Sequence, residues 1–152
     1  MGVFARRPVT TFLELTHEMY ALEVRDHIMI AHSLPGEFFG PAQKTHGATF
    51  VVDVAFFREA LNEHNVVVDI GRASEVLKAA LAPINYANLD EVPETRGKLT
   101  TTEFLCRYIF DRMAEAARGG QLGPGSDGLA KIRVTLHESH VARAWFEGPV
   151  AT

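Results

Sequence analysis

Three side chains that could bind a metal or transfer a proton stand at the ends of apolar strand faces in this 152-residue chain. They are His32, His46 and Glu138, and each shares its face of a predicted strand with Val, Ile, Leu or Phe. Neutral imidazoles on a shared face are good zinc ligands. A buried carboxylate must be paired or hydrogen-bonded. The three residues therefore indicate a metal site, or a pocket for a ligand rich in N–H donors.

Each of these residues also has a structural interpretation. A histidine near a strand end is often a hydrogen-bonded core or rim residue, and two ligands fall short of the three protein ligands normal at catalytic zinc. Glu138 could equally pair with Arg133 or Arg143 at the rim. Glu103 follows Thr100 by three residues, the spacing of a capping box. A helix start also offers amide and hydroxyl donors to a neighbouring pocket, so a binding role stays open as well.

Two strands are expected to position the histidines. Residues 21–34 and 45–56 alternate with period two, and each has one apolar face. The segment between them, 35–44, contains two prolines and two glycines and predicts a loop. Consecutive strands joined in this way usually pair antiparallel, which places the end of the first near the start of the second. We therefore expect His32 and His46 to approach each other.

The remaining pattern predicts an α+β fold with a four-stranded antiparallel sheet and two helices on one face. Its outer strands would leave open edges, which other subunits could cover. Cys106 is expected to be a buried, inert thiol within the second helix. The predicted elements that follow the first two strands are a short β-branched run at 65–71, a helix within 74–83, a polar loop at 84–98, a helix within 98–120 that ends at Gly119-Gly120, and a hairpin of 131–138 and 141–148.

Composition narrows the class of protein. The length suits a single domain, here 19–150, with residues 1–18 as an N-terminal extension. A net charge of −4 argues against a nucleic-acid or anionic-membrane partner, and no apolar run reaches the length of a membrane span. The first residues carry two arginines but no apolar core, so we expect no secretory signal. One cysteine suits a reducing cytoplasm.

Six pieces of the chain, in order, resemble the 6-pyruvoyl-tetrahydropterin and 6-carboxytetrahydropterin synthase family. The resemblance implies a tunnelling fold, in which sheets of several subunits join edge to edge into a barrel with active sites between subunits, as in a hexamer built of trimers. The pieces are AHSL at 31–34, THGATF at 45–50, VVVDIGRASEVL at 66–77, NYANLDEVP at 85–93, TTTEFLCRYIFDRM at 100–113 and IRVTLHES at 132–139.

The resemblance also implies roles for individual residues. A pterin ring would be held by Glu138 and by a Thr-Thr-Glu at a helix start, here Thr101, Thr102 and Glu103. A carboxylate can accept two N–H donors from the guanidine-like edge of a pterin. The pterin-recognition residues of the family are thus all present.

The family's catalytic residues are not all present. Its zinc is held by three histidines; His32 and His46 match two of them, and the third position is Ala48. The family's catalytic cysteine, its nucleophile or base, has no counterpart at 40–42. A variant group of the family uses a Glu in this loop, and Glu37 lies nearby. The family's Asp-His pair aligns with Asn85-Tyr86, and tyrosine has a reference pKa of about 10.

These residues lead to two expectations of function. The first is a divergent, lyase-like enzyme acting on a pterin, dihydroneopterin triphosphate or a related bicyclic heterocycle, with Tyr86, Glu37 or a metal-bound water in proton transfer and zinc as the possible cofactor. The second is a non-catalytic oligomer that binds a pterin or purine. Zinc content and turnover separate the two.

Overall fold

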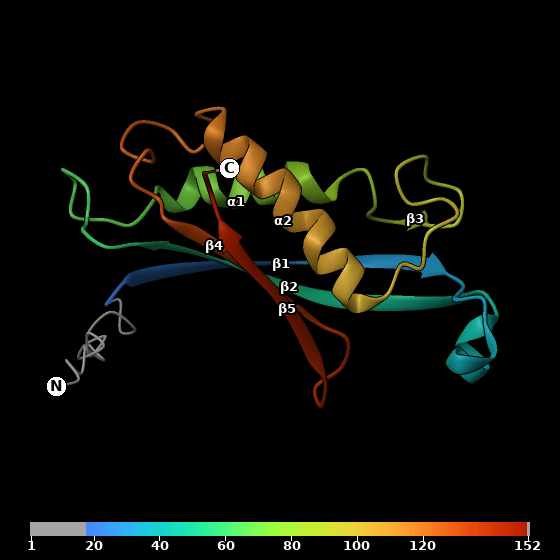
Figure 1. The fold of residues 1–152 in the computed structure, drawn as a ribbon. Helices are drawn as coiled ribbons and strands as arrows, with labels where there is room; N and C mark the ends of the chain where they lie inside the picture. Colours follow the sequence, from blue (N-terminus) through green and yellow to red (C-terminus); the bar gives the residue numbers. More distant parts are fainter. Residues whose placement is uncertain (1–17, 152) are drawn as a thin grey trace, which may run out of the picture.

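The computed structural model describes residues 18–151. These residues form one five-stranded sheet with the order β3-β1-β2-β4-β5, and two α-helices cover one of its faces (Figure 1). The elements in chain order are β1 (Tyr20–His32), the 3-10 helix η2 (Glu37–Gln43), β2 (His46–Arg58), α1 (Ile70–Leu81), β3 (Ala87–Asn88), α2 (Thr102–Arg118), β4 (Lys131–His137) and β5 (Arg143–Pro149).

The predicted α+β architecture is confirmed, with one correction to the strand count. Four long strands, β1, β2, β4 and β5, pair antiparallel as expected. The fifth, β3, contributes two residues that pair parallel with Ile30 and Ala31 of β1. So short a strand has no alternation to detect in the sequence. The predicted four-stranded sheet is therefore the major part of a five-stranded one.

Two further segments differ from their predictions. Residues 65–71 form a bend and the start of α1 instead of a strand. Val67 and Val68 are buried there without strand pairing, and the side chain of Asp69 caps α1 by accepting from the Arg72 N–H at 3.0 Å. The predicted loop at 35–44 contains η2. At 65–71 the burial of Val67 and Val68 and the Asp69 cap decide the backbone, and the strand-like run of valines does not.

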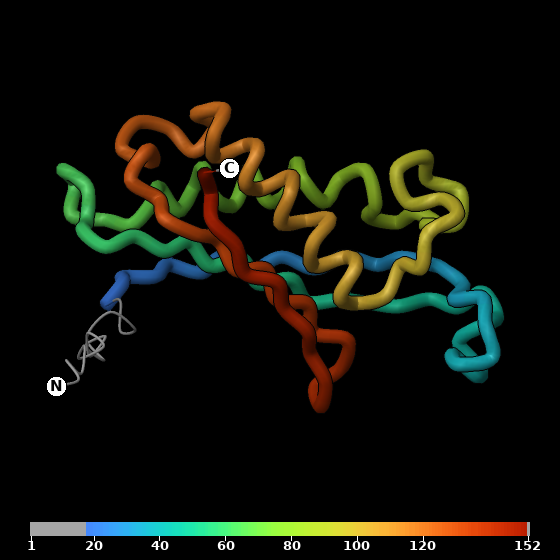
Figure 2. Tube along the Cα trace, viewed as in Figure 1, coloured from blue at the N-terminus to red at the C-terminus, as the bar shows by residue number. Residues whose placement is uncertain are grey.

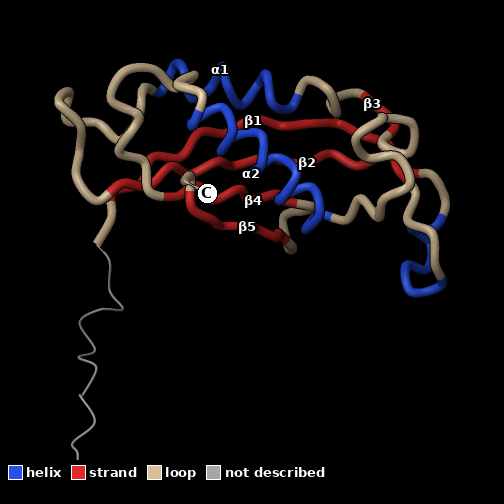
Figure 3. The backbone as a smooth tube through the Cα atoms, turned by 45° about the horizontal axis from the view of Figure 1, so that its top comes forward, coloured by secondary structure: helices blue, strands red, loops and turns tan. Residues whose placement is uncertain are grey.

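The core lies between the sheet and the helices, which Figure 3 shows lying over the strands. Alternate residues of the long strands point into it, as the period-two pattern predicts. Complete burial of an aliphatic or aromatic side chain contributes about 1.5–3 kcal/mol, so this layer holds the sheet and helices together. Fully buried members include Ile28, Phe50 and Phe56 from the sheet and Leu77, Leu105, Ile109 and Met113 from the helices.

Helix α2 begins one residue later than a capping box at Thr100 would require. Its N-cap is Thr101, whose Oγ1 accepts from the Phe104 N–H at 3.2 Å. The predicted Thr100–Glu103 capping box is therefore wrong, although Glu103 still lies in the first turn, where its charge suits the helix dipole. The helix ends before Gly119, as predicted. Thr100 is left free for a different contact.

The chain path brings distant segments to one end of the sheet. Figure 2 shows η2 beyond the point where β1 ends and β2 begins, and α2 starts nearer to this end of the sheet than it finishes. Within residues 18–151 no helix has both the length and the apolar character needed to cross a membrane. Cys106 is fully buried in α2, as predicted, and burial raises the pKa of its thiol to about 11.

Candidate ligand-binding site

A pocket of about 640 Å³ opens at the end of the sheet where β1 and β2 meet the start of α2. This volume lies within the range of about 300–1,000 Å³ typical of small-molecule sites. Its apolar lining includes Leu34, Phe39, Ala42, Ala48 and Phe50. Its polar lining includes His32, His46, Thr101, Thr102, Glu103 and Glu138. The pocket therefore gathers all six residues predicted to bind a metal or a ring.

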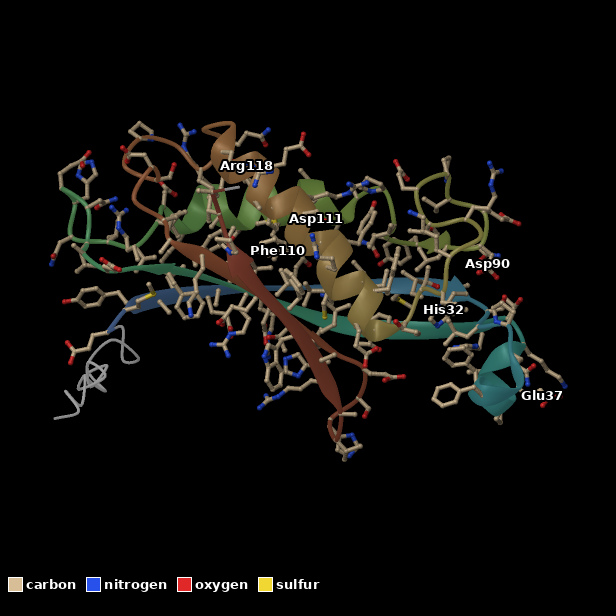
Figure 4. The ribbon with its side chains drawn as sticks, viewed as in Figure 1. His32, Glu37, Asp90, Phe110, Asp111 and Arg118 are labelled. Carbon is tan, nitrogen blue, oxygen red and sulfur yellow. The ribbon has the colours of Figure 1, made fainter. Side chains whose placement is uncertain are left out.

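A second hollow of similar size, about 660 Å³, lies beside the end of α2 and the loop at 123–129. Its charged lining is limited to Arg118 and Asp127, and no histidine or glutamate lines it. Figure 4 shows Arg118 near the end of α2, far along the sheet from His32. The grouping of titratable side chains thus singles out the pocket at the other end of the sheet.

His32 and His46 lie directly opposite each other in the β1–β2 ladder. Their ring centroids are 4.6 Å apart and the rings meet edge to face. The Nδ1 of His46 lies 2.8 Å from the carbonyl oxygen of Lys44. A carbonyl only accepts, so this nitrogen carries the proton and Nε2 of the neutral ring is left as an acceptor. The predicted approach of the two histidines is confirmed.

His32 is held from the other side by Thr100. Its Nδ1 lies 3.0 Å from Thr100 Oγ1, and both residues are buried. Burial lowers the pKa of His32 below its ordinary value, and the neighbouring His46 lowers it further. The ring is therefore neutral at neutral pH and offers its second nitrogen to the pocket.

Glu138 reaches the pocket from the turn between β4 and β5 and not from the strand itself. β4 ends at His137, so Glu138 is exposed instead of buried on the inward face. Its Oε2 accepts a hydrogen bond from Thr102 Oγ1 at 3.3 Å. Within residues 18–151 no ion pair joins it to Arg133 or Arg143; Arg133 instead lies 3.5 Å from Glu147. The carboxylate thus stays available to a ligand.

The described residues do not complete a zinc site. His32 and His46 supply two imidazoles, and Ala48, which lines the same pocket, has no donor atom. No group of three His, Cys, Asp or Glu side chains within residues 18–151 is placed to hold a metal ion. Zinc sites in enzymes normally use three protein ligands. The donor set of this chain does not fit that requirement.

The two residues predicted to be catalytic, Tyr86 and Glu37, lie outside the lining of this pocket. Tyr86 is 76% exposed and has a φ of 56°, an uncommon conformation for a residue other than glycine. Its N–H donates to the carbonyl of Met29 at 2.7 Å, while Asn85 Oδ1 accepts from the Met29 N–H at 3.1 Å. Glu37 is exposed on η2 (Figure 4).

Sequence patterns missed two contacts near the pocket. Thr100 supports His32 from 68 positions away, and no local pattern marks such a pair. Asp90 accepts from both Ser33 Oγ, at 2.6 Å, and Ser33 N, at 3.3 Å, which fixes the chain as it leaves β1. Figure 4 shows Asp90 close to the same end of the sheet as His32. Both contacts depend on the fold bringing loops together.

Solved structures share this fold at low sequence identity. A 6-pyruvoyl tetrahydropterin synthase from Caenorhabditis elegans aligns with a TM-score of 0.70 and 21% identity, over 86% of this chain and 96% of that one. The enzyme of the same name from Plasmodium vivax aligns with a TM-score of 0.68 and 14% identity, over 87% of this chain and 99% of that one.

Sequence comparisons give the family. A 6-pyruvoyl tetrahydrobiopterin synthase from Dictyostelium discoideum is 28% identical over 79 residues, which span 51% of this chain and 58% of that relative. Residues 21–149 match the family described as 6-pyruvoyl tetrahydropterin synthase. The chain therefore belongs to the 6-pyruvoyl tetrahydropterin synthase family.

Proposed function

We propose that this protein binds a pterin, or a related bicyclic heterocycle, in the pocket between β1, β2 and the start of α2, and acts on it as a divergent lyase-like member of its family. The observation that carries the proposal is the convergence of Glu138, Thr102 and the His32–His46 pair on one pocket. Membership of the family supports a pterin as the class of ligand.

The acidic side of the pocket suits a guanidine-like edge. Glu138 has one oxygen hydrogen-bonded to Thr102, which orients the carboxylate and leaves further acceptor positions open. A carboxylate that accepts two N–H donors fixes both the position and the plane of a flat ligand. Phe39 and Phe50 line the same pocket and can contact the faces or edges of such a ring.

Proton transfer in this proposal involves the neutral His32 and two residues supplied by other subunits. Tyr86 and Glu37 lie outside their own chain's pocket, so they would act at a pocket only across a subunit boundary. We propose a homo-oligomer, a hexamer of two trimers, with the ligand between subunits. β5 and the two-residue β3 leave sheet edges that neighbouring strands could extend. Dihydroneopterin triphosphate is the first substrate to test.

A second candidate function is a pterin- or purine-binding oligomer without catalysis. The observation in its favour is a contrast: the pocket contains every residue expected to bind the ring, whereas Ala48 leaves the metal shell incomplete. The two functions predict the same binding and differ in turnover. An assay of dihydroneopterin triphosphate, with and without Tyr86→Phe, separates them.

Calorimetric titration with neopterin, dihydroneopterin and guanine tests the shared part of both functions. Glu138→Gln should weaken binding by about 10- to 100-fold, because a hydrogen bond to a charged group contributes about 1.5–3 kcal/mol. Glu91→Gln is the matched control, since Glu91 is an exposed acid outside the pocket lining. If none of the three compounds binds, or if both variants bind as the native protein does, the proposal is wrong.

A further inference from the structure

We infer that residue 48 decides the metal content of this pocket: the native chain does not retain zinc as a resident ion, and a single imidazole at position 48 would create a zinc site. The inference concerns the same pocket as the proposed function, but it does not depend on which organic ligand binds there. It follows from the register of β1 and β2 and from the contacts of the nearby donor groups.

Position 48 lies where a third ligand would have to stand. Ala48 follows His46 by two residues on β2, so both side chains lie on the same face, with Cα atoms about 7 Å apart. In the β1–β2 ladder His46 faces His32 and Ala48 faces Ile30. Ala48 is half-buried and lines the pocket beside both histidines. A side chain longer than alanine would therefore extend toward the imidazole pair.

The two histidines are already oriented as zinc ligands would be. The Nδ1 of His46 donates to the Lys44 carbonyl, and the Nδ1 of His32 is hydrogen-bonded to Thr100. Metal-binding histidines usually make such a contact through the nitrogen that does not bind the metal. Each ring therefore has its Nε2 left for a ligand, and only the number of donors is insufficient.

No other donor side chain among residues 18–151 is grouped with His32 and His46 so as to hold a metal ion. Both carboxylate oxygens of Asp90 accept from Ser33. Glu103 and Glu138 line the pocket, but neither completes a group of three metal-binding side chains with the two histidines. The thiol of Cys106 is buried in α2 and points to the Ala144 carbonyl at 3.4 Å. The part of the chain that the structure describes thus provides two zinc ligands at this site and no third.

The test is metal analysis and zinc titration of the full-length protein purified without chelator, in its native oligomeric state. The native protein should contain well under one zinc per chain. Ala48→His should bind about one zinc per chain, with an affinity at least about 100-fold higher than that of the native protein. Loss of a residue that only supports a metal ligand already lowers metal affinity by about 10- to 100-fold, so gain of a ligand should have at least that effect. Cobalt substitution should give the visible bands of a tetrahedral site only in Ala48→His. The matched control is His46→Ala in the Ala48→His background, which should lose the gain.

Two results would overturn the inference. One is a native protein that binds one zinc per chain tightly, since a donor beyond those described would then complete the shell. The other is a folded Ala48→His protein with no gain in zinc affinity. If that variant does not fold, the smaller Ala48→Cys and the native measurement decide. Titration of pterins in the presence of chelator is independent, so failure of pterin binding would reject the proposed function and leave this inference standing.

Discussion

The imidazole of His32 and the hydroxyl of Thr100 form a buried hydrogen bond, 3.0 Å long, between residues 68 positions apart. Thr100 immediately precedes the N-cap of α2, and His32 is the last residue of β1. The contact therefore ties the start of the helix to the end of the strand, where the pocket opens. It also leaves one nitrogen of His32 directed to a ligand.

Removal of the Thr100 hydroxyl should destabilise the protein. Thr100→Val leaves a buried imidazole nitrogen without its partner, so we expect the free energy of unfolding to fall by about 1–3 kcal/mol. Thr100→Ser keeps the hydroxyl, so its free energy of unfolding should fall by less. Urea unfolding measures both, and ¹⁵N NMR of His32 should show an altered tautomer balance only in the valine variant. Equal stability and equal spectra for the two variants would argue against an orienting role.

A second polar cluster lies on the sheet face away from the helices. Asp53, which is buried, accepts from Arg25 at 2.6 and 2.8 Å and lies 2.7 Å from His137 Nε2. The cluster spans β1, β2 and β4. Asp53→Asn should cost about 1–3 kcal/mol at neutral pH, because it weakens two buried or half-buried contacts at once. Asp111→Asn, which breaks the exposed pair with Arg107, is the control and should cost under about 0.5 kcal/mol.

The same cluster predicts part of the acid dependence of stability. Hydrogen bonding by Arg25 holds the pKa of Asp53 below its ordinary value, and His137 acts in the same direction. A carboxyl with a lowered pKa stabilises the fold above its unfolded-state pKa of about 3.9, and this contribution is lost as pH falls through the folded value. The difference in stability between the native protein and Asp53→Asn should therefore shrink as the pH falls from about 4 through the lowered folded-state pKa. A difference that stays constant down to pH 2 would contradict the assignment.

The sequence predicted the geometry that follows from alternation. The two-residue period predicted the strands β1 and β2, and the expected antiparallel pairing predicted that His32 and His46 approach each other, as they do in the ladder. Both statements need only local pattern and a short connection. The same logic failed for Glu138, since the strand ends one residue earlier and a turn carries the carboxylate to Thr102.

Contacts between distant loops could not be predicted in this way. The partnership of Thr100 with His32 requires the fold itself, and the capping-box spacing suggested a different role for Thr100. β3 is too short to show a period, and residues 65–71 carry strand-like valines that pack in a bend. In each case tertiary packing overrides a weak local preference.

The thiol of Cys106 should not react in the native protein. Burial raises its pKa to about 11, so the thiolate is scarce at pH 8 and reagent has no access. A disulfide reagent should modify the thiol only after unfolding exposes it, so the rate of labelling should equal the rate at which the protein unfolds around Cys106. Rapid native labelling would show that α2 opens locally or that the residue is reactive.

Gly148 is required by the packing of two aromatic rings. A Cβ at this position would lie 2.8 Å from Phe110 Cζ and 3.2 Å from Phe146 Cε1. Those rings pack edge to face with centroids 4.8 Å apart, so neither can move without disturbing the contact between α2 and β5. We expect Gly148→Ala to cost about 1–3 kcal/mol through overpacking. This exceeds the gain of about 0.4–1 kcal/mol from a less flexible unfolded chain.

Gly47→Ala provides the comparison within the same sheet. Its added Cβ would meet only the Ile30 carbonyl oxygen at 3.8 Å, an ordinary contact, so stability should be unchanged or slightly raised. Thermal and urea unfolding of the two variants measure the difference directly. A Gly148→Ala protein as stable as Gly47→Ala would mean that Phe110 moves aside at little cost, and that the ring pair does not fix the position of β5 under α2.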